Sequence, residues 1–85
     1  GPPRARRPQV RGVSARPEKR SLTLRGHRTS VSLEAAFWNA LIDAARAEGL
    51  SVNRLCERID EARGAEAGLA SAIRVWLLER ALTRP

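Results

Sequence analysis

The segment from Arg28 to Leu33 alternates polar and apolar side chains with a period of two, and helical spacing begins directly after it. Its most polar members are Arg28, Ser30 and Ser32. A guanidinium group donates paired hydrogen bonds in a fixed geometry, and a serine hydroxyl both donates and accepts. These side chains suit recognition of a polar or anionic surface, so the segment predicts binding.

The sequence contains no pattern that is typical of catalysis or metal binding. It has one histidine, His27, and one cysteine, Cys56, and no Cys/His metal-ligand spacing. It also lacks a glycine-rich phosphate loop and a nucleophile beside a base. We therefore predict that the protein is not an enzyme and uses neither a metal nor another cofactor. Cys56 lies on an apolar helical stripe and is expected to be a small buried residue.

A strand as short as residues 28–33 cannot satisfy its backbone hydrogen-bonding groups alone. Residues 21–25 alternate Leu22 and Leu24 with polar side chains, but Gly26 separates them from the strand, so whether they extend the ribbon stays open. No convincing partner strand is evident elsewhere. We expect a second copy to supply the partner, giving a two-stranded antiparallel ribbon across a two-fold axis. One face would cover the dimer core, and the other would be free to enter a DNA major groove.

Three helices are predicted after the strand. The first begins at Glu34 and ends at Gly49, an expected left-handed C-cap. The second follows the N-cap Ser51 and continues to about Ala62. The third covers residues 69–82. The single residue between Gly49 and Ser51 predicts a tight turn between the first two helices.

The predicted fold class is mainly α with one short strand, arranged as an intertwined homodimer with a third C-terminal helix on each chain. The chain has 85 residues and is 42% apolar, but it contains two Trp and one Phe and no Tyr, so a single copy makes a marginal core. Trp38 and Trp76 are expected in core or dimer contacts. The apolar stripes predict a dimer core made of Val31, Leu33, Phe37, Leu41, Leu55 and Ile59.

The net charge of +7 is concentrated at the N-terminal end of the chain. Residues 34–85 carry seven Arg and eight acidic residues, which leaves a balance of −1. Residues 1–20 are rich in proline and arginine, so we expect a disordered basic arm there and a folded domain over residues 21–85. A neutral body with a basic end suits a polyanion bound at that end. The alternative is a solvated tail that serves solubility.

No apolar run approaches the length that spans a membrane, and residues 1–20 lack the hydrophobic stretch of a secretory signal. The single cysteine excludes a disulfide within the chain and is compatible with a reducing compartment. We therefore expect a cytoplasmic, nucleoid-associated protein.

The strand, the tightly turned helix pair and the basic leader together resemble the ribbon-helix-helix family, the Arc and MetJ class of dimeric DNA-binding proteins. The run RGHRTSVSLEAAFWNAL and the turn Gly49-Leu50-Ser51-Val52-Asn53 carry the resemblance, which covers roughly residues 25–63. They are similar to a bacterial subgroup with an extra C-terminal helix. The family relationship implies a two-stranded ribbon that enters the DNA major groove.

The resemblance also assigns roles to residues. It implies base contacts from Arg28, Ser30 and Ser32, and it places Thr29, Val31 and Leu33 on the core face. It implies phosphate contacts at the start of the second helix, from Ser51, Val52 and Asn53. Beside the strand, Arg25 and His27 are further expected phosphate contacts. The plainer interpretations are an exposed strand charge at Arg28, an ordinary N-cap at Ser51 and a structural or exposed His27.

The basic arm offers further contacts to DNA. Its arginines could lie along phosphates or enter a neighbouring minor groove. Its cations are Arg4, Arg6, Arg7, Arg11, Arg16, Lys19 and Arg20.

As the resemblance implies, the chain is expected to be a sequence-specific transcriptional regulator, most plausibly a repressor that binds double-stranded DNA as a homodimer. One alternative is a dimeric interaction module such as an antitoxin, whose third helix binds a partner protein. That alternative predicts incomplete burial of Trp76 and Leu77. A second alternative is a basic RNA-binding or nonspecific nucleoid protein that acts chiefly through the arm.

Overall fold

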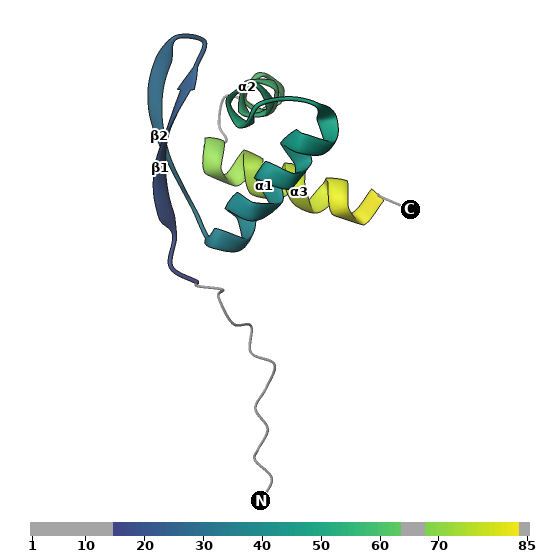
Figure 1. The fold of residues 1–85 in the computed structure, drawn as a ribbon. Helices are drawn as coiled ribbons and strands as arrows, with labels where there is room; N and C mark the ends of the chain where they lie inside the picture. Colours follow the sequence, from purple (N-terminus) through teal and green to yellow (C-terminus); the bar gives the residue numbers. More distant parts are fainter. Residues whose placement is uncertain (1–14, 64–67, 84–85) are drawn as a thin grey trace, which may run out of the picture.

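The computed structural model describes residues 15–63 and 68–83. Two strands, β1 (Glu18–Leu24) and β2 (His27–Leu33), form an antiparallel hairpin. Three helices follow, α1 (Ala35–Glu48), α2 (Val52–Ala62) and α3 (Leu69–Thr83). The hairpin stands along one side of the three helices, which pack together beside it (Figure 1). The three predicted helices are therefore confirmed, with α3 one residue longer than expected.

The hairpin closes through a two-residue turn. Arg25 has a φ of 53° and Gly26 a φ of 82°. Two central residues with positive φ match the right-handed twist of paired strands, and glycine accepts this conformation at low cost. The turn sets the register in which Leu24 lies opposite His27 and Ser21 lies opposite Ser30.

The expectation that the strand would lack a partner in its own chain was wrong. Residues 21–25, whose part in the ribbon the sequence left open, lie in a seven-residue strand and its turn, and this strand pairs with the whole of β2. Gly26 allows the reversal instead of merely separating two pieces. Residues 18–20, expected in the arm, are the first residues of β1. A two-stranded antiparallel sheet is thus present within one chain.

The junction between α1 and α2 has the predicted caps. Gly49 adopts a left-handed φ of 72°, and the N–H groups of Gly49 and Leu50 donate to the carbonyls of Arg46 and Ala45 at 3.1 and 2.9 Å. These bonds satisfy carbonyls that the helix leaves open. The Ser51 hydroxyl accepts from the Arg54 N–H at 3.1 Å, which confirms its N-cap role. This turn fixes how α2 leaves α1.

One hydrophobic core joins the hairpin to the helices. Its side chains, each at most 7% exposed, are Leu22, Leu24, Val31, Leu33, Trp38, Leu41, Ala44, Ala45, Leu55, Cys56, Ile59, Ile73 and Leu77. Of the six residues predicted for a dimer core, five are buried inside this one chain, and Phe37 packs partly buried against it. The predicted burial of Cys56 is confirmed, and the apolar surroundings raise the pKa of its thiol to about 11. The third helix completes the core because Ile73 and Leu77 enter it.

Two polar contacts fix the ends of the core. The indole N–H of Trp38 donates to the Glu18 carbonyl at 2.9 Å, and the Arg20 guanidinium lies 4.8 Å from the centre of the same ring. These contacts hold the start of β1 on α1. At the start of α1, the Arg74 guanidinium binds both carboxylate oxygens of Glu34, with distances of 2.9 to 3.2 Å. That pair ties α3 to the β2–α1 junction.

Candidate nucleic-acid interface

The outward face of the hairpin is polar on both strands and carries no acidic side chain. Residues directly opposite in an antiparallel pair lie on the same face, and successive residues alternate between faces. The register therefore places two cations and four hydroxyls on the outward face, which we call the ribbon face: Lys19, Ser21 and Thr23 from β1, and Arg28, Ser30 and Ser32 from β2. All are exposed except Ser32, which is half-buried.

The inward face explains why the ribbon face points to solvent. Leu22, Leu24, Val31 and Leu33 alternate with the ribbon face and are 0 to 7% exposed in the core. A slip of one residue in either strand would exchange these leucines and valine for polar side chains. Burial of the inward face thus holds Arg28, Ser30 and Ser32 together on the opposite face, as the sequence predicts. Thr29, predicted on the core face, is half-buried.

The charge of the helices is largely neutralised by ion pairs with arginines of the helices and of the hairpin turn. Residues 1–33 sum to +8 and residues 34–85 to −1. Arginines neutralise most of the described helical carboxylates at 2.6 to 3.8 Å, in the pairs Arg74–Glu34, Arg46–Asp43, Arg80–Glu48, Arg54–Glu57, Arg63–Asp60 and Arg25–Glu61. The ribbon face therefore presents positive charge at one side of a nearly neutral body.

Arg25, a predicted phosphate contact, lies at the hairpin turn and is held by α2. Its backbone N–H donates to Glu57 at 2.8 Å, and its guanidinium lies 3.1 Å from Glu61 and 4.0 Å from Asp60. The Arg25 N–H, followed by the Arg54 side chain, holds the pKa of the Glu57 carboxyl below its ordinary value. Much of the Arg25 charge is thus directed at α2, and the residue anchors the turn.

His27, the other predicted phosphate contact beside the strand, is exposed but does not belong to the ribbon face. It lies opposite Leu24, in the alternating set that includes Thr29 and Val31. A shallow hollow near it is lined by Leu24, Arg25, His27, Thr29, Asp60, Arg63 and Leu69.

The start of α2 combines an ordinary cap with open amide groups. Ser51 and Asn53 are exposed and Val52 is half-buried. The Ser51 hydroxyl is occupied by the Arg54 N–H, whereas the amides of Val52 and Asn53 lie in the first turn, where a helix supplies no acceptor. The positive end of the helix dipole and these amides suit an anion such as a phosphate.

Most of the predicted basic arm lies outside the described residues. This applies to Arg4, Arg6, Arg7 and Arg11. Arg16 is exposed just before β1, whereas Lys19 and Arg20 belong to β1 itself and point to opposite faces. The sequence analysis missed Ser21 and Thr23 and placed Lys19 only in the arm. The alternation of Leu22 and Leu24 with polar residues was the signal for all three.

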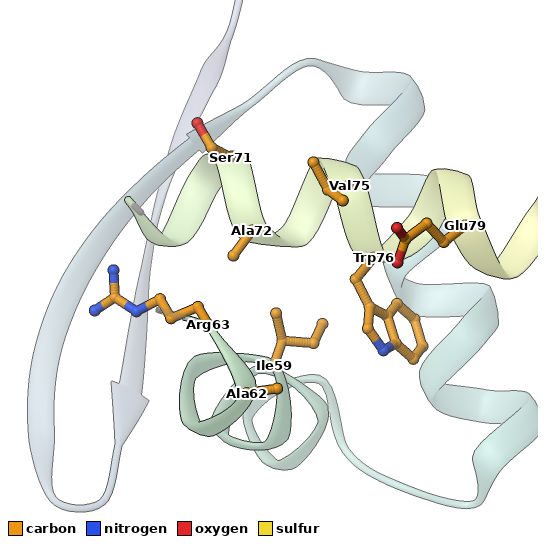
Figure 2. A pocket seen from close by; sticks show the side chains of 8 residues that line it. All are labelled: Ile59, Ala62, Arg63, Ser71, Ala72, Val75, Trp76 and Glu79. Carbon is orange, nitrogen blue, oxygen red and sulfur yellow. The ribbon is translucent and has the colours of Figure 1, made fainter. Parts of the chain in front are cut away.

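A second exposed surface lies on α3 and is apolar. Val75, Leu78 and Leu82 are 54, 57 and 73% exposed, and we call these three residues the α3 ridge. On one side of Val75, α2 and α3 enclose a hollow of about 300 Å³, lined by the residues shown in Figure 2. On the other side, α1 and α3 border a hollow of about 380 Å³. Sequence reasoning did not identify the ridge, although its spacing of three and four residues was visible.

The two residues singled out for a partner-binding third helix differ in burial. Trp76 is half-buried at the α2–α3 hollow, with the Arg80 guanidinium 6.0 Å from its ring centre. Leu77 is 7% exposed and belongs to the core. The partner-binding alternative predicts incomplete burial of both residues. The half-buried Trp76 agrees with this prediction, whereas the buried Leu77 does not.

The described part of the chain contains neither a metal-ion cluster nor a membrane-spanning helix. Residues 15–63 and 68–83 contain no group of His, Cys, Asp and Glu side chains arranged to hold a metal ion. Within the same residues, no helix is long and apolar enough to cross a membrane.

Comparison with known proteins identifies the fold family. Among solved structures, the chain is similar to an uncharacterized protein from Bordetella pertussis Tohama I, with a TM-score of 0.67 and 37% sequence identity. The match covers 78% of this chain and 56% of that protein, so this chain spans little more than half of its relative's length. No curated protein matches. A sequence model of the ribbon-helix-helix domain matches residues 17–81, and the chain therefore belongs to the ribbon-helix-helix domain family.

Proposed function

We propose that this protein is a sequence-specific DNA-binding transcriptional regulator that inserts its two-stranded ribbon into the major groove. The observation that carries the proposal is the ribbon face, where Lys19 and Arg28 accompany four hydroxyls without an acidic neighbour on that face. A two-stranded ribbon fits the major groove, where arginine or lysine binds guanine and serine binds either purines or pyrimidines. The family to which the chain belongs generally consists of DNA-binding regulators or antitoxins, which supports the same conclusion.

Different parts of the surface would make different contributions to binding. Arg28, Ser30 and Ser32 contact base edges, and the first turn of α2 at Ser51 to Asn53 holds a phosphate. The arginines of residues 1–16 add charge that favours any duplex. Because serine is short and reads many bases, Arg28 carries the largest share of the sequence discrimination from β2.

We propose that the protein acts as a repressor. A domain bound to promoter DNA blocks access to the promoter by covering it. Ribbon-helix-helix proteins usually bind DNA as dimers, and we propose that two copies of this chain occupy paired half-sites.

The test is selection of duplexes from a randomised pool at near-physiological salt, followed by affinity measurements on the recovered sequence. We expect a recurring motif for the full chain. Replacing Arg28→Ala should cost about 1 to 3 kcal/mol on that motif and much less on random DNA. The matched control is Arg46→Ala, which removes the same charge from an exposed site on α1, 3.7 Å from Asp43. Equal losses for Arg28→Ala on both DNAs would reduce Arg28 to a phosphate contact.

A second candidate function is a protein-interaction module, and the α3 ridge favours it. Three large apolar side chains more than half exposed on one helix, with hollows on both sides, are typical of a surface that another protein covers. Removing α3 would not test this function because Ile73 and Leu77 hold the core. Leu78→Gln leaves the core intact and should abolish partner binding while leaving DNA binding unchanged. Persistence of partner binding in that variant would exclude the ridge.

A further inference from the structure

β2 has one edge that is paired and one edge that is open. In the described part of the chain, the sheet consists of β1 and β2 alone, so β1 covers a single edge of β2. Beside a two-residue turn the flanking pair exchanges hydrogen bonds, and every second pair after it does the same. The backbone N–H and C=O groups of Arg28, Ser30 and Ser32 therefore point away from β1. The Arg74 guanidinium donates to the Ser32 carbonyl at 3.4 Å, which agrees with this direction.

The open edge of β2 suits the same edge of a second copy. Among the described residues, no backbone group of another element is hydrogen-bonded to it, and an open strand edge pairs readily with another strand. An antiparallel pair of β2 strands centred on Ser30 matches the donors of each copy with the acceptors of the other. The two Arg28 side chains then lie about 13 Å apart along the pair, at about 3.3 Å per residue, so their charges do not face each other. The dimer proposed above thus has the strand order β1–β2–β2–β1.

The width of such a sheet separates the positions of its inner and outer strands on DNA. Neighbouring strands lie about 4.8 Å apart, so each β2 lies about 2.4 Å from the two-fold axis and each β1 about 7 Å from it. The major groove is about 12 Å wide, so its walls lie about 6 Å from its middle. The two β2 strands therefore fit between the walls, whereas the β1 strands meet the sugar-phosphate backbones that form them.

We propose that the β1 strands bind the phosphates on both rims of the major groove through Lys19, Ser21 and Thr23, while the paired β2 strands contact the bases between them. This inference rests on the DNA-binding function and the dimer proposed above. Ammonium and hydroxyl groups are common donors to phosphate oxygens. The acidic residue of β1, Glu18, belongs to the alternating set that faces the helices and pairs with Arg20 at 3.2 Å. The outward face of β1 therefore presents donors to the phosphates without an opposing carboxylate.

The first experiment tests the strand order without DNA. Ser30→Cys places two thiols directly opposite each other on the inner strands, within reach of a disulfide. The matched control is Ser21→Cys, which lies opposite Ser30 in its own chain but on an outer strand, about 14 Å from the other outer strand. After mild oxidation we expect a covalent dimer of Ser30→Cys on a non-reducing denaturing gel and none of Ser21→Cys, with the unmodified chain as the control for the buried Cys56. A linked Ser21→Cys, or an unlinked Ser30→Cys, would overturn the strand order and the proposal.

The second experiment distinguishes a phosphate contact from a base contact at Lys19. Lys19→Ala should make the slope of log affinity against log salt less negative by about 0.9 for each chain, equally on the selected motif and on random duplex. Lys19→Arg keeps the charge and should restore the slope. Arg46→Ala removes a cation from an exposed site on α1 and should leave the slope unchanged. The base preference should stay as it is in all three variants.

The outcomes separate this proposal from the function on which it rests. A Lys19→Ala variant that keeps the slope of the full chain, or that relaxes the base preference, would overturn the role of β1 and leave DNA binding by β2 in place. A full chain that binds no duplex would overturn the proposed function and the role of β1 together, whereas the cross-link would still report the strand order.

Discussion

The ribbon face and the α3 ridge are both exposed, but their chemistry is opposite. The ribbon face presents two cations and four hydroxyls on the hairpin, and the ridge presents three aliphatic side chains beside two apolar hollows. In each case the opposite face of the same element enters the core. Packing against the core therefore explains where both surfaces lie. It does not determine which side chains each surface presents.

This contrast separates two kinds of recognition in one small domain. Cations and hydroxyls bind favourably to a hydrated polyanion such as DNA. Exposed aliphatic side chains contribute favourable binding free energy only when they are buried against another apolar surface. The ribbon face is thus suited to nucleic acid and the ridge to protein.

The largest effect should distinguish the two faces of α3. Ile73 is 0% exposed, so Ile73→Ala should lower the free energy of unfolding by about 2 to 5 kcal/mol. Leu82 is 73% exposed, and Leu82→Ala should change it by less than about 0.5 kcal/mol. Urea denaturation followed by circular dichroism measures both. Comparable losses would show that the ridge is covered in solution.

The next effect concerns the salt dependence of DNA binding. Deleting residues 1–14 removes four arginines and leaves β1 whole. If about half of these charges neutralise phosphates, the slope of log affinity against log salt should become less negative by roughly 2 per chain. Leu78→Gln changes the ridge alone and should leave the slope as it is. An unchanged slope after the deletion would remove the arm from the binding mechanism.

A smaller effect is expected at the N-cap of α2. Ser51→Ala removes the acceptor of the Arg54 N–H and should lower the free energy of unfolding by about 1 kcal/mol. Ser71→Ala is the matched control, because it removes the same hydroxyl from an exposed position within α3. If the open amides of Val52 and Asn53 beside this cap also hold a phosphate, Ser51→Ala should weaken binding equally on specific and random DNA. A loss restricted to the specific motif would contradict that role.

The smallest effect is a pH dependence at the hairpin turn. The Arg25 N–H and Arg54 lower the pKa of Glu57 in the folded chain, so the charged carboxylate stabilises the fold. This contribution is complete above the ordinary glutamate pKa and is lost as the pH falls through the lowered value. Glu57→Gln should flatten the acid limb of the unfolding curve. An unchanged limb would show that Glu57 does not anchor the turn.

The three helices could be predicted from the sequence because the signals that mark them are local. Gly49 and Ser51 mark the α1–α2 turn by their own conformational preferences, and both caps are confirmed. The alternation around Val31 and Leu33 likewise predicted which residues of β2 enter the core.

The contacts that the sequence did not reveal join residues far apart in the chain. β1 contains only two apolar residues, Leu22 and Leu24, and its strand character depends on their packing against helices that follow later. The Trp38–Glu18 and Arg25–Glu57 bonds join residues 20 and 32 positions apart, so no local pattern announces them. The alternation around Leu22 and Leu24 could have placed Lys19, Ser21 and Thr23 on one face of a strand. The ribbon face that they share with β2 depends on the pairing of β1 with β2, which no local pattern reveals.

The most direct test of the division between the two surfaces is the backbone amide NMR spectrum of the labelled chain during titration with a selected duplex. We expect the largest shift changes at residues 19–23 and 28–32 of the hairpin and at residues 51–54, with residues 75–82 of α3 nearly unchanged. Changes centred on the α3 ridge, with the hairpin unaffected, would contradict the account.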